Sequence, residues 1–293
     1  MKNKSKAFFI GGLSVLLIFN CVKPVTPTKI RVLTTIYPLA MIAQEVGGDS
    51  ISVSTIIPPG SSPHTFEPTP ELATQISSAQ LLIMNGAKLE NWLTPALKAF
   101  SEDKKKRILI ASDGEHLIPI SGTNEPNPHI WLSPRRMKRL AERIAAELSA
   151  IAPQDSAYFF SRAGTTIARL DTLDKMLALL FAPHTGKFFV SIEPAWSYLA
   201  SDYGFNEIGF LSPEPSRQVK PTELKELTKK IKEHRVRVFL SQKGLDQKII
   251  APVVKELGLK LIITDPLGSP SDTLVNTYEK LILYNAKLIA GGL

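Results

Sequence analysis

The chain has 293 residues, with 35 lysine and arginine residues against 27 aspartate and glutamate residues, which gives a net charge of +8 at pH 7. Its one cysteine, Cys21, excludes an internal disulfide and any metal site built from several thiolates. The densest basic cluster, residues 104–107, directly follows Glu102 and Asp103, as is typical of a solvated helix end, so we expect no nucleic-acid partner.

The amino terminus has the pattern of an export signal. Lys2, Lys4 and Lys6 precede an uncharged apolar run at residues 7–19. This run is shorter than the roughly 20 residues needed to span a bilayer, so we predict a signal peptide over residues 1–21. The protein is therefore expected in the periplasm or at the outer face of the cytoplasmic membrane.

A polar, Pro-rich stretch over residues 22–29 follows the leader and is predicted to be a tether. Cys21 stands directly after the apolar run, where a lipoprotein signal places the residue that becomes acylated. Asn20, just before it, is not the small residue that such signals prefer. A lipid anchor on Cys21 and a leader without lipid both stay open.

Short β-branched runs alternate with amphipathic segments along the first part of the chain, which predicts an α/β lobe over residues 30–152. We expect Ser133 to cap the last helix of this lobe with its side chain, and Pro134 fits the first turn. Predicted strands lie at residues 31–36, 51–57, 81–84 and 107–110, and predicted helices at residues 70–76, 92–100 and 133–150.

The same alternation resumes over residues 183–293 and predicts a second, similar lobe. The fold class is therefore α/β, with two lobes that each hold a mostly parallel sheet. Predicted strands lie at residues 188–192, 207–211, 236–240 and 259–264, and predicted helices at residues 195–202, 221–233, 248–257 and 272–289.

One long helix is predicted to join the lobes over residues 153–182. Apolar side chains recur there every three or four positions from Phe159 to Leu180. At 1.5 Å per residue, about 28 residues make a rod on the order of 40 Å long. Because a helix is stiffer than a loop, we expect small shifts rather than large hinge closure.

Two of the five histidines stand in Pro-rich loops that lie between predicted elements. His64 lies in the loop 58–68, which follows a strand and precedes a helix, and His129 lies just ahead of another helix. Open α/β sheets bind ligands in such loops, and the flanking prolines restrict the backbone. Taken singly, each is first read as an ordinary loop histidine. We expect His234, in a basic helix end, to face the solvent, and His116 and His184 to be loop residues without a partner.

Two acidic residues follow strands of the second lobe. Glu193 comes directly after the run 188–192, and Asp265 after the run 259–264. The carboxyl ends of parallel strands gather binding groups, so two carboxylates could face two imidazoles across a cleft between the lobes. The alternative is that each acid caps the helix that follows it.

The chain resembles the zinc, manganese and iron receptors of bacterial ABC importers, which form the cluster A-I family of solute-binding proteins. The resemblance covers residues 30–293. The agreement is ordered along the sequence and is more specific than a single motif. The matching pieces are Ile36-Tyr37-Pro38-Leu39, the loop 60–70, residues 85–93, 128–132, 193–199 and 202–204, Pro213-Glu214-Pro215-Ser216, and Asp265-Pro266-Leu267-Gly268.

The resemblance implies four metal ligands, which are His64, His129, Glu193 and Asp265 in this sequence. A carboxylate at the third of these positions, as in Glu193, is similar to the members of the manganese and iron branch. Asp265-Pro266-Leu267-Gly268 is closer to zinc-type members, so Asp265 or a water is the fourth ligand. Ser133 and Gln242 depart from the residues usual at their positions, which puts the surface where the ion enters in doubt.

The resemblance also implies that the protein is a monomer, is not an enzyme, and delivers one Mn²⁺, Zn²⁺ or Fe²⁺ ion as cargo to the permease and ATPase of an ABC importer. A surface adhesin of the same fold is an alternative. A metal-dependent hydrolase is a further one, but the sequence has no His-Glu-x-x-His helix, no Gly-x-Ser-x-Gly elbow and no Gly-rich phosphate loop.

Overall fold

The computed structural model describes residues 29–211 and 221–293. The predicted signal peptide, Cys21, residues 22–28 of the tether and the motif at residues 213–216 lie outside the described residues. Within these two ranges, no helix combines the length and the apolar character that crossing a membrane requires.

The first sheet has four parallel strands in the order β2-β1-β3-β4. All four residues of β3 are buried, whereas burial alternates along the edge strand β2, as expected from their positions in a sheet with covered faces. The strands are β1 (Ile30–Thr34), β2 (Ile51–Thr55), β3 (Leu81–Met84) and β4 (Arg107–Ile110), and the helices are α1 (Tyr37–Gly47), α2 (Pro70–Ser78), α3 (Thr94–Glu102) and α4 (Pro134–Ile151).

The second sheet repeats this topology, with four parallel strands in the order β6-β5-β7-β8. The expectation of two similar α/β lobes with parallel sheets is therefore confirmed. The strands are β5 (Phe188–Ser191), β6 (Asn206–Phe210), β7 (Val238–Gln242) and β8 (Lys260–Thr264), and the helices are α6 (Ser197–Tyr203), α7 (Pro221–Glu233), α8 (Gln247–Glu256) and α9 (Tyr278–Ala290).

Some predicted boundaries were wrong. The helix expected from residue 272 begins only at Tyr278, because the side chain of Thr277 accepts a hydrogen bond from the backbone N–H of Lys280 and starts the helix there. Ser133 does precede α4, but its side chain makes no capping hydrogen bond. Its hydroxyl instead donates to Asp202 and accepts from Arg136.

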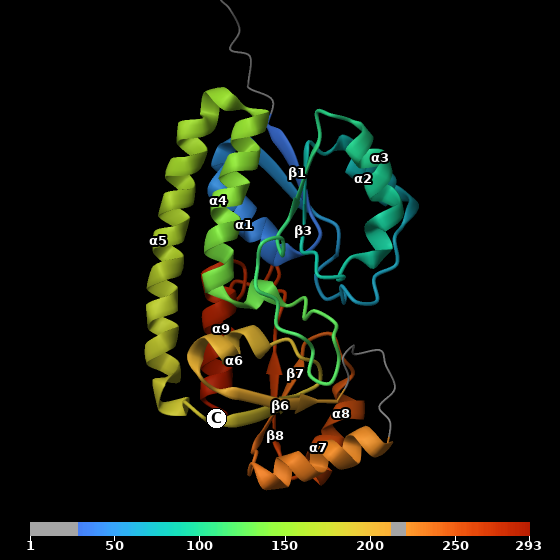
Figure 1. Ribbon diagram of the computed structural model, residues 1–293, viewed down its shortest axis with the longest axis vertical. Helices are drawn as coiled ribbons and strands as arrows, with labels where there is room; N and C mark the ends of the chain where they lie inside the picture. The colour runs from blue at the N-terminus through green and yellow to red at the C-terminus, as the bar shows by residue number, and fades with distance from the viewer. Residues whose placement is uncertain (1–28, 212–220) are drawn as a thin grey trace, which may run out of the picture.

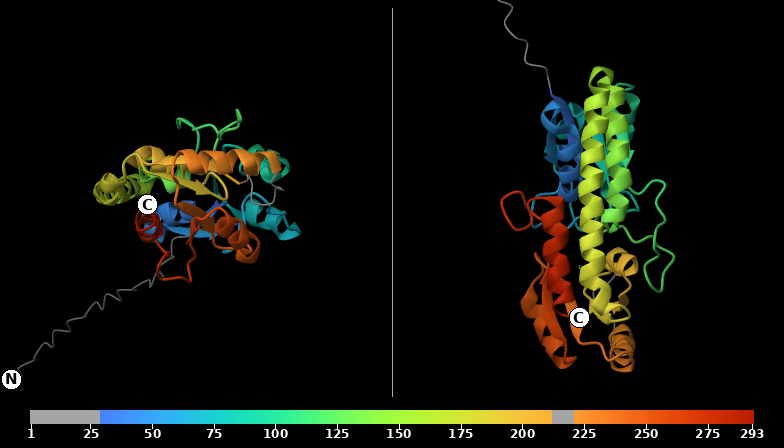
Figure 2. Two further views of the ribbon diagram at one scale, coloured as in Figure 1. Left: turned by 90° about the horizontal axis from the view of Figure 1, so that it is seen from below. Right: turned by 90° about the vertical axis from the view of Figure 1, so that its left-hand side faces the viewer.

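The predicted connecting helix is α5 (Ser156–Phe181), 26 residues or about 39 Å long. It runs beside α4 and α9 and extends along both lobes (Figures 1 and 2). The proposed division into residues 30–152, 153–182 and 183–293 stays a prediction.

The buried apolar side chains form two clusters. The larger one is continuous from the first sheet through α4, α5 and α9 to one face of the second sheet. The smaller one fills the other face of the second sheet under α7 and α8. Because the lobes share the larger cluster, rotating one against the other would expose apolar surface, which is unfavourable. The carboxyl ends of both sheets thus stay directed at the junction (Figure 1).

The shared core can be tested on two leucines of α5. Leu177 is fully buried, whereas the side chain of Leu179 is 78% exposed. We expect Leu177→Ala to lower the free energy of unfolding by about 2–5 kcal/mol, because it leaves a cavity. The matched control Leu179→Ala should change it by less than about 0.5 kcal/mol. Urea denaturation followed by circular dichroism measures both, and equal effects would contradict this account of the core.

Candidate metal centre

Three potential metal ligands meet where loops from the two sheets converge. His64 lies in the loop after β2, His129 ends the long connection after β4, and Glu193 follows β5. They line a cavity of about 370 Å³ at the junction of the lobes. A larger cavity of about 630 Å³, between α1, β2 and residues 270–277, contains no histidine and none of these ligands, so the smaller cavity is the candidate site.

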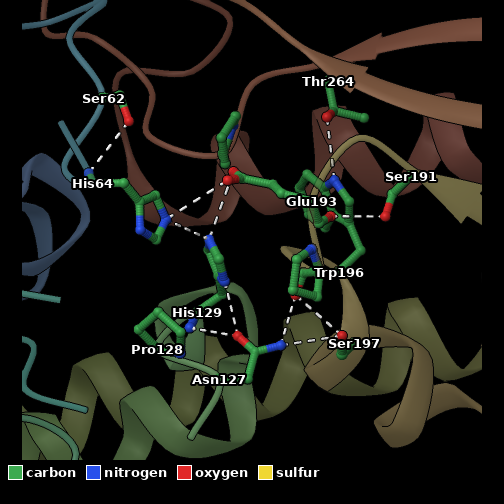
Figure 3. Close-up of polar contacts among 12 residues, drawn as sticks. Ser62, His64, Asn127, Pro128, His129, Ser191, Glu193, Trp196, Ser197 and Thr264 are labelled. Atoms are coloured by element: carbon green, nitrogen blue, oxygen red, sulfur yellow. Dashed lines mark hydrogen bonds and ion pairs between the residues drawn. The ribbon is translucent and has the colours of Figure 1, made fainter. Parts of the chain in front are cut away.

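The ligand atoms have the spacing of a metal coordination shell. Nε2 of His64 lies 3.3 Å from Nε2 of His129, and the carboxylate of Glu193 faces both nitrogens, with Oε2 3.6 Å from His64 and Oε1 3.6 Å from His129 (Figure 3). Metal bonds of 2.0–2.2 Å at tetrahedral angles place neighbouring ligand atoms about 3.3–3.6 Å apart. A single small ion between the three side chains could therefore contact all of them.

Burial makes this arrangement unfavourable without a cation. Glu193 is 3% exposed and His129 is 1% exposed. Within the described residues, Oε2 of Glu193 has no hydrogen-bond partner. Burying an ionised carboxylate oxygen without a partner raises the free energy of the folded protein, and a bound divalent ion would supply that partner.

The pKa values of two of these groups suit a metal ligand. Burial lowers the pKa of His64 to about 4, against the opposing effect of Glu193, so its imidazole is neutral at neutral pH. Burial acts to raise the pKa of Glu193, but the hydrogen bond and charge of His129, followed by smaller effects of His64 and Gln242, hold it below its usual value. A neutral imidazole and an ionised carboxylate are the forms that bind metal.

The side chain of Asn127 holds His129 and connects the two lobes. Its Oδ1 lies 2.8 Å from Nδ1 of His129 and accepts a hydrogen bond from the His129 backbone N–H at 3.0 Å. Its Nδ2 donates to the backbone oxygen of Pro194 at 2.6 Å and to Oγ of Ser197 at 3.1 Å (Figure 3). Since Oδ1 can only accept, Nδ1 of His129 carries a proton, so Nε2 is the nitrogen left to bind a metal ion at the centre.

A buried glutamic acid supports the loop that carries Glu193. The hydroxyls of Ser191 and Ser197 both contact the carboxyl group of Glu207 and also lie within hydrogen-bond distance of the backbone oxygens of Glu193 and Pro194. Two hydroxyl protons cannot serve four acceptors, whereas a proton on Glu207 provides a further donor. Part of the Glu207 side chain is exposed, but its carboxyl group is enclosed, and burial raises its pKa to about 7.

Asp265 lines the same cavity but does not belong to the cluster of three. Its Oδ1 accepts hydrogen bonds from the backbone N–H groups of Leu267 and Gly268, and its Oδ2 lies 3.1 Å from Nζ of Lys243. Its role as fourth ligand stays a prediction, as does the role of the other three.

The alternative that the two acids cap helices is wrong. The residue that precedes α6 is Trp196 rather than Glu193, and Thr277 caps α9 in place of Asp265. The other three histidines lie apart from the cluster: His116 and His234 are exposed, and the half-buried His184 lies near Phe181.

The sequence alone did not indicate a role for Asn127, Glu207 or Lys243. Asn127 had a local signal, because it stands two residues before His129 with a proline between them. Lys243 directly follows a strand of the second sheet, where binding groups gather. Glu207 had no signal, because its carboxyl group reaches the loop only through the pairing of β5 with β6.

A comparison with protein-family models matches residues 32–292 to the family described as zinc-uptake complex component A, periplasmic. Among curated proteins, the zinc-binding lipoprotein AdcA of Streptococcus pneumoniae is 28% identical over 294 residues, which cover 95% of this chain and 58% of AdcA. The chain thus spans a little over half of the length of that relative. The manganese ABC transporter substrate-binding lipoprotein PsaA of the same species is 27% identical over 277 residues, or 90% of this chain and 89% of PsaA.

Solved structures of metal-binding proteins also align with most of this chain. The crystal structure of Zn(II)-bound AdcA from Streptococcus pneumoniae aligns with a TM-score of 0.77 at 28% identity, covering 90% of this chain and 58% of AdcA. The structure of the laminin-binding protein Lmb of Streptococcus agalactiae, described as bifunctional with adhesin and metal-transporting activity, aligns with a TM-score of 0.79 at 25% identity, covering 90% of this chain and 99% of Lmb.

Removing the side-chain amide of Asn127 should weaken both metal binding and the contact between the two lobes. We expect Asn127→Ala to weaken zinc binding about 10- to 100-fold, because the ring of His129 loses its fixed orientation. The free energy of unfolding should also fall by about 1–3 kcal/mol, because buried polar groups are left unpaired. Calorimetric titration and urea denaturation measure the two effects. The exposed Asn206 provides the matched control Asn206→Ala. Identical behaviour of both variants would argue against Asn127 as the connection between the two lobes.

Glu207 should make the metal-free protein less stable as pH rises. The folded state keeps the proton of Glu207 up to about pH 7, whereas the unfolded chain loses it near pH 4.5. This contribution is complete below pH 4.5, and about 3 kcal/mol of it is lost as pH rises through 7. We expect Glu207→Gln to remove this loss, so its stability relative to wild type should increase with pH. Urea denaturation with chelator, from pH 4.5 to about pH 8, measures the difference, and parallel curves would contradict the assignment.

Proposed function

Because the chain belongs to the family of the periplasmic zinc-uptake complex component A, we propose that it captures a divalent transition-metal ion outside the cytoplasmic membrane and delivers it to an ABC importer. Two relatives support this proposal: AdcA is named as a zinc-binding lipoprotein, and PsaA as the substrate-binding lipoprotein of a manganese ABC transporter. The observation that carries it is the convergence of His64, His129 and Glu193 at 3.3–3.6 Å.

The bound ion is proposed to be held by His64, His129 and Glu193, with the fourth position facing the cavity. Two imidazole nitrogens and a carboxylate oxygen suit zinc, manganese and ferrous iron. The 3.3 Å between the two imidazole nitrogens supports tetrahedral coordination, which is the usual geometry of zinc. Zinc also binds more tightly than manganese or ferrous iron to a given set of nitrogen and oxygen ligands.

The partners in this proposal are the permease and the ATPase of the importer. Export through a signal peptide and a lipid on Cys21 would keep the receptor near its permease, as the lipoprotein names of AdcA and PsaA suggest. The family is one of metal-uptake receptors and not of enzymes. Adhesion is a second activity for Lmb, but the buried ligand cluster of this chain supports metal binding and says nothing about an extracellular matrix.

The proposal predicts which residues metal binding requires. We expect His64→Ala and Glu193→Gln each to weaken zinc binding at least about 100-fold, because each removes one of three ligands from a buried site. His116→Ala should leave binding unchanged, because His116 is exposed and lies apart from the cluster. Calorimetric titration of the mature protein with zinc, manganese and ferrous iron under anaerobic conditions gives the affinities. Wild-type affinity in either ligand variant would overturn the proposed site.

A further inference from the structure

A lysine lies at the candidate metal site, where a positive charge is unexpected. Lys243 directly follows β7 and lines the same cavity as His64, His129 and Glu193. Its side chain is 46% exposed, so it stands at the solvent side of the cavity. A fixed cation there would oppose binding of a divalent ion unless it had another role.

Lys243 forms ion pairs with two carboxylates at once. Its Nζ lies 3.1 Å from Oδ2 of Asp265 and 3.1 Å from Oδ2 of Asp272. Asp265 is 7% exposed, and its other oxygen accepts two backbone N–H groups. Both oxygens of Asp265 therefore already have partners, and Asp265 lies outside the cluster of His64, His129 and Glu193. To reach an ion held by His64, His129 and Glu193, Asp265 would have to leave Lys243.

The pairing of Lys243 with Asp265 changes how much negative charge is available to balance a bound ion. With Lys243 in place, the charge of Asp265 is already neutralised, and Glu193 alone balances an ion of charge +2. If Asp265 were released, a second carboxylate could balance that ion completely. Lys243 would then keep Asp272 as its partner, so its ammonium group would stay paired.

We propose that Lys243 determines the metal selectivity of the centre by holding Asp265 away from the ion. This inference rests on the proposed function. With Asp265 held, the ion has three protein ligands and a fourth position that water fills. Zinc is satisfied by four ligands in a tetrahedron. Manganese, which prefers six ligands that are mostly oxygens, loses more from the missing carboxylate. Lys243 thus favours zinc over manganese.

The test is the ratio of the manganese and zinc dissociation constants. Lys243→Met removes the charge but keeps the length of the side chain. We expect it to strengthen manganese binding relative to zinc by about tenfold, because Asp265 becomes free to coordinate. In the double variant Lys243→Met with Asp265→Asn, the relative gain should disappear. Lys248→Met, which removes an exposed lysine of α8, is the matched control for net charge and should leave the ratio unchanged.

A second measurement counts the waters on the bound ion. Proton relaxation of water by bound Mn²⁺ should fall in Lys243→Met, because the carboxylate of Asp265 replaces one exchanging water, and should return to the wild-type value in the double variant. Thermal melts check that each variant folds, and Lys243→Gln provides a second neutral replacement for the same comparison.

Three results would overturn the role of Lys243. One is an unchanged ratio in both Lys243 variants. Another is an equal gain for both metals, which would mean simple removal of a repulsive charge. The third is a relative gain that persists in the double variant. Failure of the proposed function is distinguishable, since the wild-type protein itself would then bind neither metal.

Discussion

The side-chain amide of Asn127 is the interaction on which the metal centre depends. It accepts from His129 and donates to the backbone of Pro194, so one planar group joins a loop of the first lobe to the loop that carries Glu193. Metal–ligand bonds tolerate errors of only about 0.2 Å. Two loops from different lobes meet that tolerance only if something fixes their separation, and the rigid amide does so through hydrogen bonds at both ends.

The rest of the fold keeps that amide between its partners. A continuous apolar core and α5 hold the two sheets with their carboxyl ends facing each other, so the centre need not be assembled by closing a hinge. Entry and release of an ion then depend on the loops at the cavity. Gly244, with a φ of +88°, lies so close to Gly60 that a Cβ would be 3.1 Å from the Gly60 carbonyl oxygen. The loop after β7 thus contacts the loop of His64 across the lobes.

Buried acids near this junction are stabilised in different ways, and each way indicates a different role. Glu193 has an unpaired oxygen and two imidazoles, which leaves it ready for a cation. Glu207 is stabilised by retaining a proton, because burial raises its pKa to about 7. Asp265 has Lys243 and two backbone N–H groups. Glu90 accepts from the hydroxyl of Thr35 and from backbone N–H groups, which identifies a structural carboxylate.

The sequence by itself determined the alternation of strands and helices and the long helix α5, because these follow from local periodicity. It also indicated four candidate ligands, from two Pro-rich loops, two strand ends and the family resemblance. The tertiary structure alone decided that Asp265 pairs with Lys243, that Asn127 reaches Pro194, and that Glu207 lies under the loop of Glu193. Asn127 and Pro194 are 67 positions apart, and no local pattern encodes such a contact. The charge and the free lone pairs of a buried group depend on neighbours that only the packed sheets bring together.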